Sequence, residues 1–192
     1  MLTAPCRLSQ STRDLAHLAL SGAWGDTLVD PPLTIDGRDD LATLSDEMRY
    51  AQCVRLIAEQ APLRIFPGLR LVGSASLKPA PLHVLPVYAN GKPAFGSTSH
   101  LTLGFDQVLQ VGYRGLRAQV EERLSRGDLD AQGMDLLNAM LVCLDAATTW
   151  HRRYLEQLDA LTNETGGEEC ALYLRIRDNL CDVPENPPTT FY

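Results

Sequence analysis

Residues 130–163 read DAQGMDLLNAMLVCLDAATTWHRRYLEQLDALTN. Apolar side chains recur in this stretch every three, four or seven residues, which is the period of one face of an α-helix. The spacing therefore predicts a single long amphipathic helix. Its buried stripe is expected to consist of Met134, Leu137, Leu141, Leu144, Thr148, His151, Leu155, Leu158 and either Leu161 or Thr162.

One helix is predicted on each side of this long helix. Apolar residues follow the same period from Phe105 to Leu124, and Gly127 comes just after the last turn. Gly166-Gly167 separates the long helix from a final helix, expected at about Glu168 to Cys181. Because the connections are short, the three helices are expected to pack as neighbours. The tail, DVPENPPTTFY, is rich in proline and is expected to be extended.

Two further helices are predicted near the N-terminus. A short one is expected from Thr12 to Leu20, and residues 25–40 are expected to form a loop because prolines and glycine interrupt them. The second is expected from Ser45 to Ala61. Ser45 or Asp46 can cap its start, and Pro62 stops it.

Residues 62–104 differ in character from the helical parts of the chain. They hold six of the twelve prolines, which breaks any long regular element. Leu69–Gly73 and Leu82–Tyr88 are short enough and apolar enough to pair as strands. Asn90-Gly91 is typical of a tight hairpin turn.

The composition is that of an ordinary globular protein. The 192 residues are 45% hydrophobic and 21% charged, which suits one domain or two small ones. A net charge of −7 argues against nucleic acid or an anionic membrane surface as the main partner. Apolar runs fall well short of the roughly 20 residues of a membrane span. The N-terminal MLTAPCRLSQSTRD is too polar for a signal peptide, so we expect a cytoplasmic protein.

The five cysteines are odd in number and widely spaced. They form no CxxC pair and no zinc-ligand spacing with histidine, so neither a disulfide framework nor a zinc site is expected. Cys53 and Cys143 fall in helical apolar patterns and are predicted to be buried.

Common catalytic and nucleotide-binding motifs are absent from the sequence. It contains no GxGxxG, no GxxxxGK[ST], no GxSxG and no HExxH. Gly112 and Gly115 form a GxxG within a helical pattern, which close helix packing explains better than a phosphate cradle.

His100 is the histidine of most interest, in the segment GSTSHLT at a loop-to-helix junction. Catalysis by His100 would need a nucleophile and an orienting carboxylate, for which Ser97, Ser99 and Asp106 are candidates by proximity in sequence. A structural histidine that bridges loop backbone groups is the favoured interpretation. His151 is predicted to be a partly buried polar residue or part of an arginine-rich contact.

Charged side chains of the helices are interpreted as a solvated surface. Adjacent carboxylates on a helix point in different directions, so Asp39/Asp40, Glu121/Glu122 and Glu168/Glu169 are not expected to form acid–base dyads. Surface pairing or snorkelling is expected of Arg114, Arg117, Arg152, Arg153, Arg175 and Arg177.

Four segments, in order along the chain, resemble one known family. They are RIFPGLRLVG at 64–73, GSTSHLTLGFDQVLQVGYRGLRAQVEERL at 96–124, AMLVCLDAA at 139–147 with the following Arg153-Tyr154, and NLCDVPENPPTTFY at 179–192. The chain thereby resembles the glycyl radical enzymes of the pyruvate formate-lyase-like family. The last segment is the most specific match, and Leu69 departs from the acidic residue common in the family. The likeness covers about Ala61 to Tyr192, with a weak match in the N-terminal helix.

The resemblance implies a mainly α fold, the helical N-terminal layer of a pyruvate formate-lyase-like protein, with a few short strands and without the β/α barrel. Residues 1–192 then form a single region, made of N-terminal helices (1–61), an irregular Pro/Gly-rich segment (62–104), and a helical hairpin with a final helix (105–192). The chain is expected to stop where the next helix of the family begins. Helices that cover a barrel keep apolar surface on two sides, so an exposed apolar patch is expected.

The function implied is that of a truncated N-terminal part of a glycyl radical enzyme, silent on its own. The family's thiyl-forming cysteine and radical glycine motifs are not found here, so no catalytic, cofactor-binding or metal-binding residue is assigned, and Cys181 is interpreted as structural. The complete family member carries a protein-based glycyl radical, installed by an S-adenosylmethionine-dependent activating enzyme. Partners of this chain would be the remaining barrel portion or a second copy. A stand-alone helical protein-binding or regulatory module is the alternative, and an unrelated small enzyme built on His100 is the third hypothesis.

Substituting His100 by alanine distinguishes these interpretations. If His100 bridges loop backbone groups, we expect His100→Ala to lower the thermal unfolding temperature by a few degrees, the effect of about 1 kcal/mol. Thermal unfolding followed by circular dichroism checks this. An unchanged melting curve together with the loss of a measurable activity would instead support the small-enzyme hypothesis.

Overall fold

The computed structural model describes residues 9–20, 33–63, 65, 84, 88–89, 92–93 and 104–190. They are mainly helical and, within these ranges, form no β/α barrel. The helices are α1 (Gln10–Leu20), the 3₁₀ helix η1 (Asp39–Thr43), α3 (Asp46–Gln60), α5 (Phe105–Ser125), α6 (Ala131–Glu164) and α7 (Gly167–Asp182). The strands are β1 (Tyr88–Ala89) and β2 (Lys92–Pro93).

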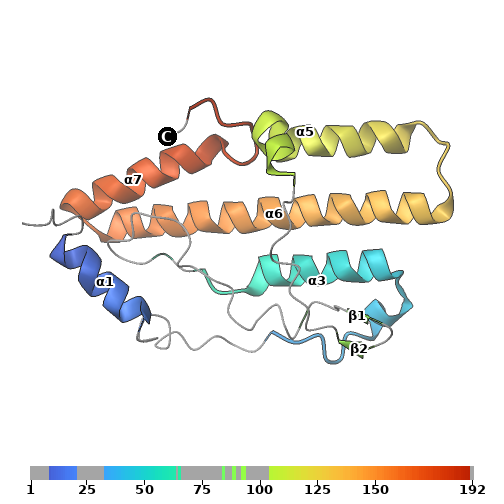
Figure 1. The fold of residues 1–192 in the computed structure, drawn as a ribbon, viewed down its shortest axis with the longest axis horizontal. Helices are drawn as coiled ribbons and strands as arrows, with labels where there is room; N and C mark the ends of the chain where they lie inside the picture. The colour runs from blue at the N-terminus through green and yellow to red at the C-terminus, as the bar shows by residue number, and fades with distance from the viewer. Residues whose placement is uncertain are drawn as a thin grey trace, which may run out of the picture.

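Helix α6 is the shared neighbour of the other long helices. It contacts α3 most extensively, then α7 and α5, whereas α3 contacts neither α5 nor α7. In Figure 1, α3 lies along one side of α6, and α5 and α7 lie along the other side, end to end. With its 34 residues, α6 is about 50 Å long, which is enough to support both helices in line.

Two of the predicted helix starts are confirmed at the level of single hydrogen bonds. The Ser45 hydroxyl accepts from the backbone N–H of Met48, which caps α3. The Asp130 carboxylate accepts from the backbone N–H of Gly133 at 2.8 Å, which caps α6. At the other end of α3, Ala61 has extended backbone angles, as expected of a residue before proline.

The main apolar core lies around α3. It joins buried residues of α3 to the segment before it, to Val84 and to one face of α6, where the Trp150 ring packs against it. Cys53 is 1% exposed and confirms the prediction of a buried cysteine. The buried members of this cluster are Leu33, Leu41, Cys53, Leu56, Ile57, Ala61 and Val84.

The chain before α3 and the hairpin each match part of the prediction. The loop expected over residues 25–40 ends earlier than predicted, because Asp39 and Asp40 begin η1, where acidic side chains suit a helix N-terminus. Strands β1 and β2 pair antiparallel with Ala89 opposite Lys92, which is a hairpin register, while Asn90 and Gly91 themselves lie outside the described residues. The predicted strand Leu69–Gly73 lies outside the described residues, as does most of Leu82–Tyr88.

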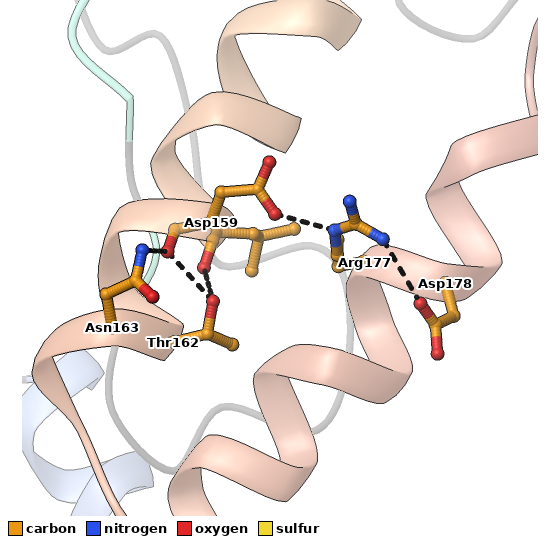
Figure 2. Close-up of polar contacts among 6 residues, drawn as sticks. Asp159, Thr162, Asn163, Arg177 and Asp178 are labelled. Atoms are coloured by element: carbon orange, nitrogen blue, oxygen red, sulfur yellow. Dashed lines mark hydrogen bonds and ion pairs between the residues drawn. The ribbon is translucent and has the colours of Figure 1, made fainter.

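An exposed ion pair links α7 to the end of α6. Figure 2 shows the Arg177 guanidinium of α7 between Asp159 of α6, at 2.6 Å, and Asp178, at 3.4 Å. Hydrogen bonding to Asp159 raises the pKa of Arg177 further above its usual value. Thr162 and Asn163 donate to the backbone carbonyl of Asp159 in the same turn.

A backbone junction holds the ends of α5 and α7 together. Helix α5 is kinked at Gly112, which has φ 63° and ψ −178°. After the kink, the N–H of Tyr113 donates to the carbonyl of Pro184 at 3.0 Å, and the N–H of Arg114 donates to the carbonyl of Glu185 at 3.1 Å. The turn after α7 therefore supplies acceptors for the first free N–H groups of the second half of α5.

This junction corrects two expectations. Gly112 does allow a close approach, but the segment that approaches is the backbone of residues 185–186 and not another helix. A Cβ atom at Gly112 would overlap the carbonyl oxygen of Glu185 and lie 2.7 Å from the carbonyl carbon of Asn186. The chain after α7 is also not extended at its start. Residues 183–185 form a turn, and the backbone N–H of Asn186 donates to the backbone carbonyl of Asp182 at 2.7 Å.

We expect Gly112→Ala to destabilise the protein by about 3 kcal/mol or more, because the new methyl group adds a clash to the strain of a positive φ. Gly127→Ala is the matched control, since Gly127 has φ 68° with nothing near its Cβ position. That variant should lose only about 1 kcal/mol. Urea unfolding of both variants checks the difference. Equal losses would show that the 185–186 backbone does not press against Gly112.

Candidate functional site

His151 of α6 lies next to the junction between α5 and the turn after α7. It is 8% exposed, and its Nε2 atom is 2.5 Å from the carbonyl oxygen of Leu180 in α7. Because a carbonyl can only accept, Nε2 carries the hydrogen, and in the neutral ring Nδ1 is then an acceptor. His151 is therefore a polar residue more deeply buried than the partly buried one predicted, and its partner is a backbone carbonyl and not an arginine.

Glu185 brings a second acceptor to the same place. Its Oε1 atom is 3.9 Å from Nδ1 of His151, and among the described side chains it is one of two buried polar atoms without a hydrogen-bond partner. Burial, and then the negative charge of Glu185, raise the pKa of Tyr113 above its usual value. Tyr113, His151 and Glu185 therefore converge from α5, α6 and the turn after α7.

A cavity of about 470 Å³ opens beside these groups, and we call it the His151 cavity. Its walls are almost wholly apolar, with tyrosine, tryptophan and histidine rings among them. This combination of apolar walls with a few convergent polar groups is typical of small-molecule sites. It is lined by Val54, Ile57, Ala58, Tyr113, Cys143, Ala146, Ala147, Trp150, His151, Tyr154, Leu180 and Pro184.

Arg153 of α6 contacts the C-terminal end of α3, next to this cavity. Its guanidinium donates to the carbonyls of Ala58 at 2.7 Å and Ala61 at 2.9 Å, which are acceptors at the end of α3 without a helical partner. It also lies 5.5 Å from the centre of the Trp150 ring. The expectation that Arg153 pairs on the surface is wrong, because the end of α3 is packed against α6 and presents carbonyls to it.

A second hollow, the α3/α5/α6 groove, has a volume of about 660 Å³. It lies over α6 between α3 and α5, which do not touch each other. Cys143 lines both this groove and the His151 cavity and is therefore only half-buried, not fully buried as predicted. The groove is lined by Asp46, Glu47, Tyr50, Gln107, Leu116, Gln119, Val120, Leu136, Ala139, Met140, Cys143 and Leu144.

Large apolar side chains are exposed on and beside this groove. Tyr50, Leu136 and Met140 line it while being 43%, 48% and 44% exposed. Phe105 and Leu109, near the start of α5, do not line the groove and are more exposed, at 61% and 58%. The expected exposed apolar patch is therefore present on α3, α5 and α6.

The residues proposed for a small enzyme are not brought together by the described structure. His100, Ser97 and Ser99 lie outside the described residues, and Asp106 is exposed in the first turn of α5. His17 is exposed on α1.

The adjacent carboxylates form local pairs instead of dyads. Asp40 pairs with Arg38, which holds the pKa of that carboxyl below its usual value through a side-chain hydrogen bond. Glu122 pairs with Arg126, and Glu169 accepts from the Tyr173 hydroxyl. The solvated-surface interpretation fits these contacts.

Within the described part of the chain, no three His, Cys, Asp or Glu side chains are placed to hold a metal ion together. Of the helices described, none has the length and apolarity needed to cross a membrane.

Similarity to known proteins agrees with this fold. The sequence profile of a family described as "PFL-like: Pyruvate formate lyase-like" matches residues 82–192, more than half of the chain. The chain belongs to the pyruvate formate lyase-like family. The match includes α5, α6, α7 and the turn that closes the junction, so Gly112, His151 and Glu185 all lie within it. No curated protein matches the sequence.

One solved structure covers nearly the whole chain. It comes from work on 1,2-propanediol dehydration in Roseburia inulinivorans and the structural basis of substrate and enantiomer selectivity. It has a TM-score of 0.71 and 15% sequence identity, over 98% of this chain and 32% of that chain. This likeness shows the fold, and the chain spans about a third of the length of that structure.

Sequence reasoning missed Glu185, Tyr113 and the role of Arg153. Three signals were available. Glu185 follows Pro184 in the most specific family segment, and Tyr113 follows the glycine that permits the close approach. Arg153 lies three residues after Trp150, one helical turn away. None of these signals reveals that α3, α5 and α7 meet the same part of α6.

We expect Arg153→Ala to destabilise the protein by about 2 kcal/mol, because two buried carbonyls lose a charged donor. Arg152→Ala is the matched control, since the neighbouring Arg152 is exposed. That variant should change stability by less than about 0.5 kcal/mol. Chemical unfolding of both variants measures the difference. Similar values for the two would contradict the cap on α3.

Proposed function

We propose that this chain is the helical N-terminal layer of a glycyl radical enzyme of the pyruvate formate-lyase, dehydratase or lyase type, and that it does not catalyse a reaction alone. Family membership and the fold support the type of protein. The five cysteines lie outside the sequence context of the family's thiyl cysteine, which supports the absence of catalysis.

The observation that carries the proposal is the α3/α5/α6 groove with its exposed apolar rim. A monomeric soluble protein seldom exposes a contiguous apolar surface of this kind without a partner. The similar solved chain is about three times as long, so its fold continues well beyond the part that this chain resembles. We propose that the barrel portion of such a fold covers the groove.

The remaining expectations follow from the same family. In the complete enzyme, a protein-based glycyl radical, installed by an S-adenosylmethionine-dependent activating enzyme, would supply the radical chemistry. The residues described here would contribute support and contacts and no step of the reaction. We propose the cytoplasm and anaerobic metabolism as the setting, with neither nucleic acid nor membrane as a partner.

A stand-alone protein-binding or regulatory module is the second candidate function. The closed core around α3, where Ala51 is fully buried and Cys53 is 1% exposed, favours it. A chain with such a core can fold without a barrel, and its groove would then bind a separate protein.

Size-exclusion chromatography with light scattering, together with thermal unfolding, separates these functions. If a barrel normally covers the groove, we expect the isolated chain to self-associate. Met140→Glu should reduce this association, because it places a charge in the apolar contact. Leu174→Glu is the matched control, since Leu174 of α7 is 45% exposed and lies outside the groove.

A stable monomer that melts cooperatively would contradict the layer proposal and favour the independent module. Association that both variants reduce equally would show that the groove is not the contact surface.

A further inference from the structure

We propose that the segment which covers the α3/α5/α6 groove is an amphipathic α-helix, with its apolar side chains against α6 and a lysine or arginine beside Glu47. This inference rests on the proposed function, in which another part of a longer fold covers the groove. It adds the secondary structure and the charge of the covering segment. The apolar floor of the groove, its helical walls and the sign of its charges carry it.

The floor of the groove is an apolar stripe on α6. Leu136, Met140 and Cys143 line the groove and are four and three residues apart, so they lie on one face of the helix. With Leu144, the stripe extends for about 12 Å along the helix axis, or a little over two turns. Leu136 and Met140 are about half-exposed, so the stripe is long enough and open enough for a helix of about three turns to lie along it.

The walls of the groove favour a helix over an extended segment. Every described residue that lines it belongs to α3, α5 or α6, whose backbone groups are paired within each helix. An extended segment carries an N–H and a C=O group at nearly every residue, and these walls present no strand edge to pair with them. A helix pairs its own backbone groups and can bury its apolar side chains in the groove at no such cost.

The charges that line the groove are negative. Within the described part of the chain they belong to Asp46 and Glu47, both in the first turn of α3. Asp46 is paired with Arg49 of the same helix. Glu47 has no ion pair and no side-chain hydrogen bond with another described residue. Its carboxylate can therefore form a charge-assisted hydrogen bond with a cation of the covering helix, and it would repel an acidic residue.

The opposite edge of the groove is uncharged. The described residues that α5 contributes to it are Gln107, Leu116, Gln119 and Val120. A basic residue is therefore matched on the α3 edge and not on the α5 edge. We expect a covering helix with apolar residues at i, i+4 and i+7 and its lysine or arginine on one flank of that stripe.

Fluorescence anisotropy of a labelled peptide titrated with the 192-residue chain tests the groove. The probe is an acetylated and amidated alanine-rich peptide of about 15 residues, with leucines at helical spacing and arginines on one flank. We expect saturable binding with a Kd of about 10 μM, and binding about tenfold weaker when glutamates replace the arginines. Equal binding of the two peptides would overturn the proposal.

A matched pair of charge substitutions separates the groove from general attraction to an acidic protein. Glu47→Gln should weaken binding of the arginine peptide about fivefold, because it removes the charge and keeps the shape. Glu168→Gln is the control, since Glu168 is also in the first turn of a helix, α7, but lies outside the groove. That variant should bind the peptide as the unmodified chain does. An equal loss in both variants would mean that net charge alone attracts the peptide, against the proposal.

A matched pair of apolar substitutions locates the peptide on α6. Leu136→Ala should weaken its binding about fivefold, because apolar contact with the stripe is lost. Leu174→Ala should leave binding unchanged, since Leu174 is as exposed as Leu136 but lies on α7, outside the groove. Equal effects of the two substitutions would place the peptide elsewhere and overturn the proposal.

A proline in the middle of the peptide tests the secondary structure, because it breaks a helix and leaves the charge unchanged. We expect the proline peptide to bind at least about tenfold more weakly, and the original peptide to gain helical circular dichroism on binding. Equal binding of the proline peptide would show that the groove does not select a helix.

Failure of this inference can be told apart from failure of the proposed function. If neither peptide binds while the isolated chain self-associates and Met140→Glu reduces that association, the helix inference is wrong and the layer proposal stands. If the chain is a stable monomer that binds the arginine peptide with the selectivity above, the layer proposal is wrong. The helix that fills the groove then belongs to a separate protein.

Discussion

The contact between the backbone of residues 184–186 and the kink at Gly112 is the constraint on which the rest of this structure depends. Two N–H groups of α5 and two carbonyls of the turn after α7 join the ends of these helices. The imidazole of His151 in α6 hydrogen-bonds to the carbonyl of Leu180 and so links the last turn of α7 to α6. A side chain at position 112 would overlap the backbone of residues 185–186 and disturb this contact.

Helix α6 contacts α3, α5 and α7, and its side chains line both hollows between these helices. Since α5 and α7 lie in line on one side of it and α3 on the other, their separation leaves hollows over α6. Cys143 lies at the boundary between the two hollows. One hollow has exposed apolar side chains at its rim, and the other is almost wholly apolar, with the rings of Tyr113, Trp150, His151 and Tyr154 in its walls.

Much of the fold was predictable because its signals are local. The caps at Ser45 and Asp130, the stop at Pro62 and the pairing of β1 with β2 depend on residues near each other in the chain. The candidate site was not predictable in this way. Tyr113, His151 and Glu185 are far apart in sequence, and their meeting depends on how α5 and α7 abut.

By itself, the sequence determined the helices, their order, the exposed apolar character and the likeness to pyruvate formate-lyase-like proteins, because periodicity and family motifs are properties of the chain. The tertiary structure alone decided that Gly112 breaks a helix, that Arg153 caps α3 and that Glu185 is left with a buried acceptor. The first two features depend on backbone groups of distant segments, which every residue carries and no sequence pattern marks. The third depends on how the turn after α7 packs against α6.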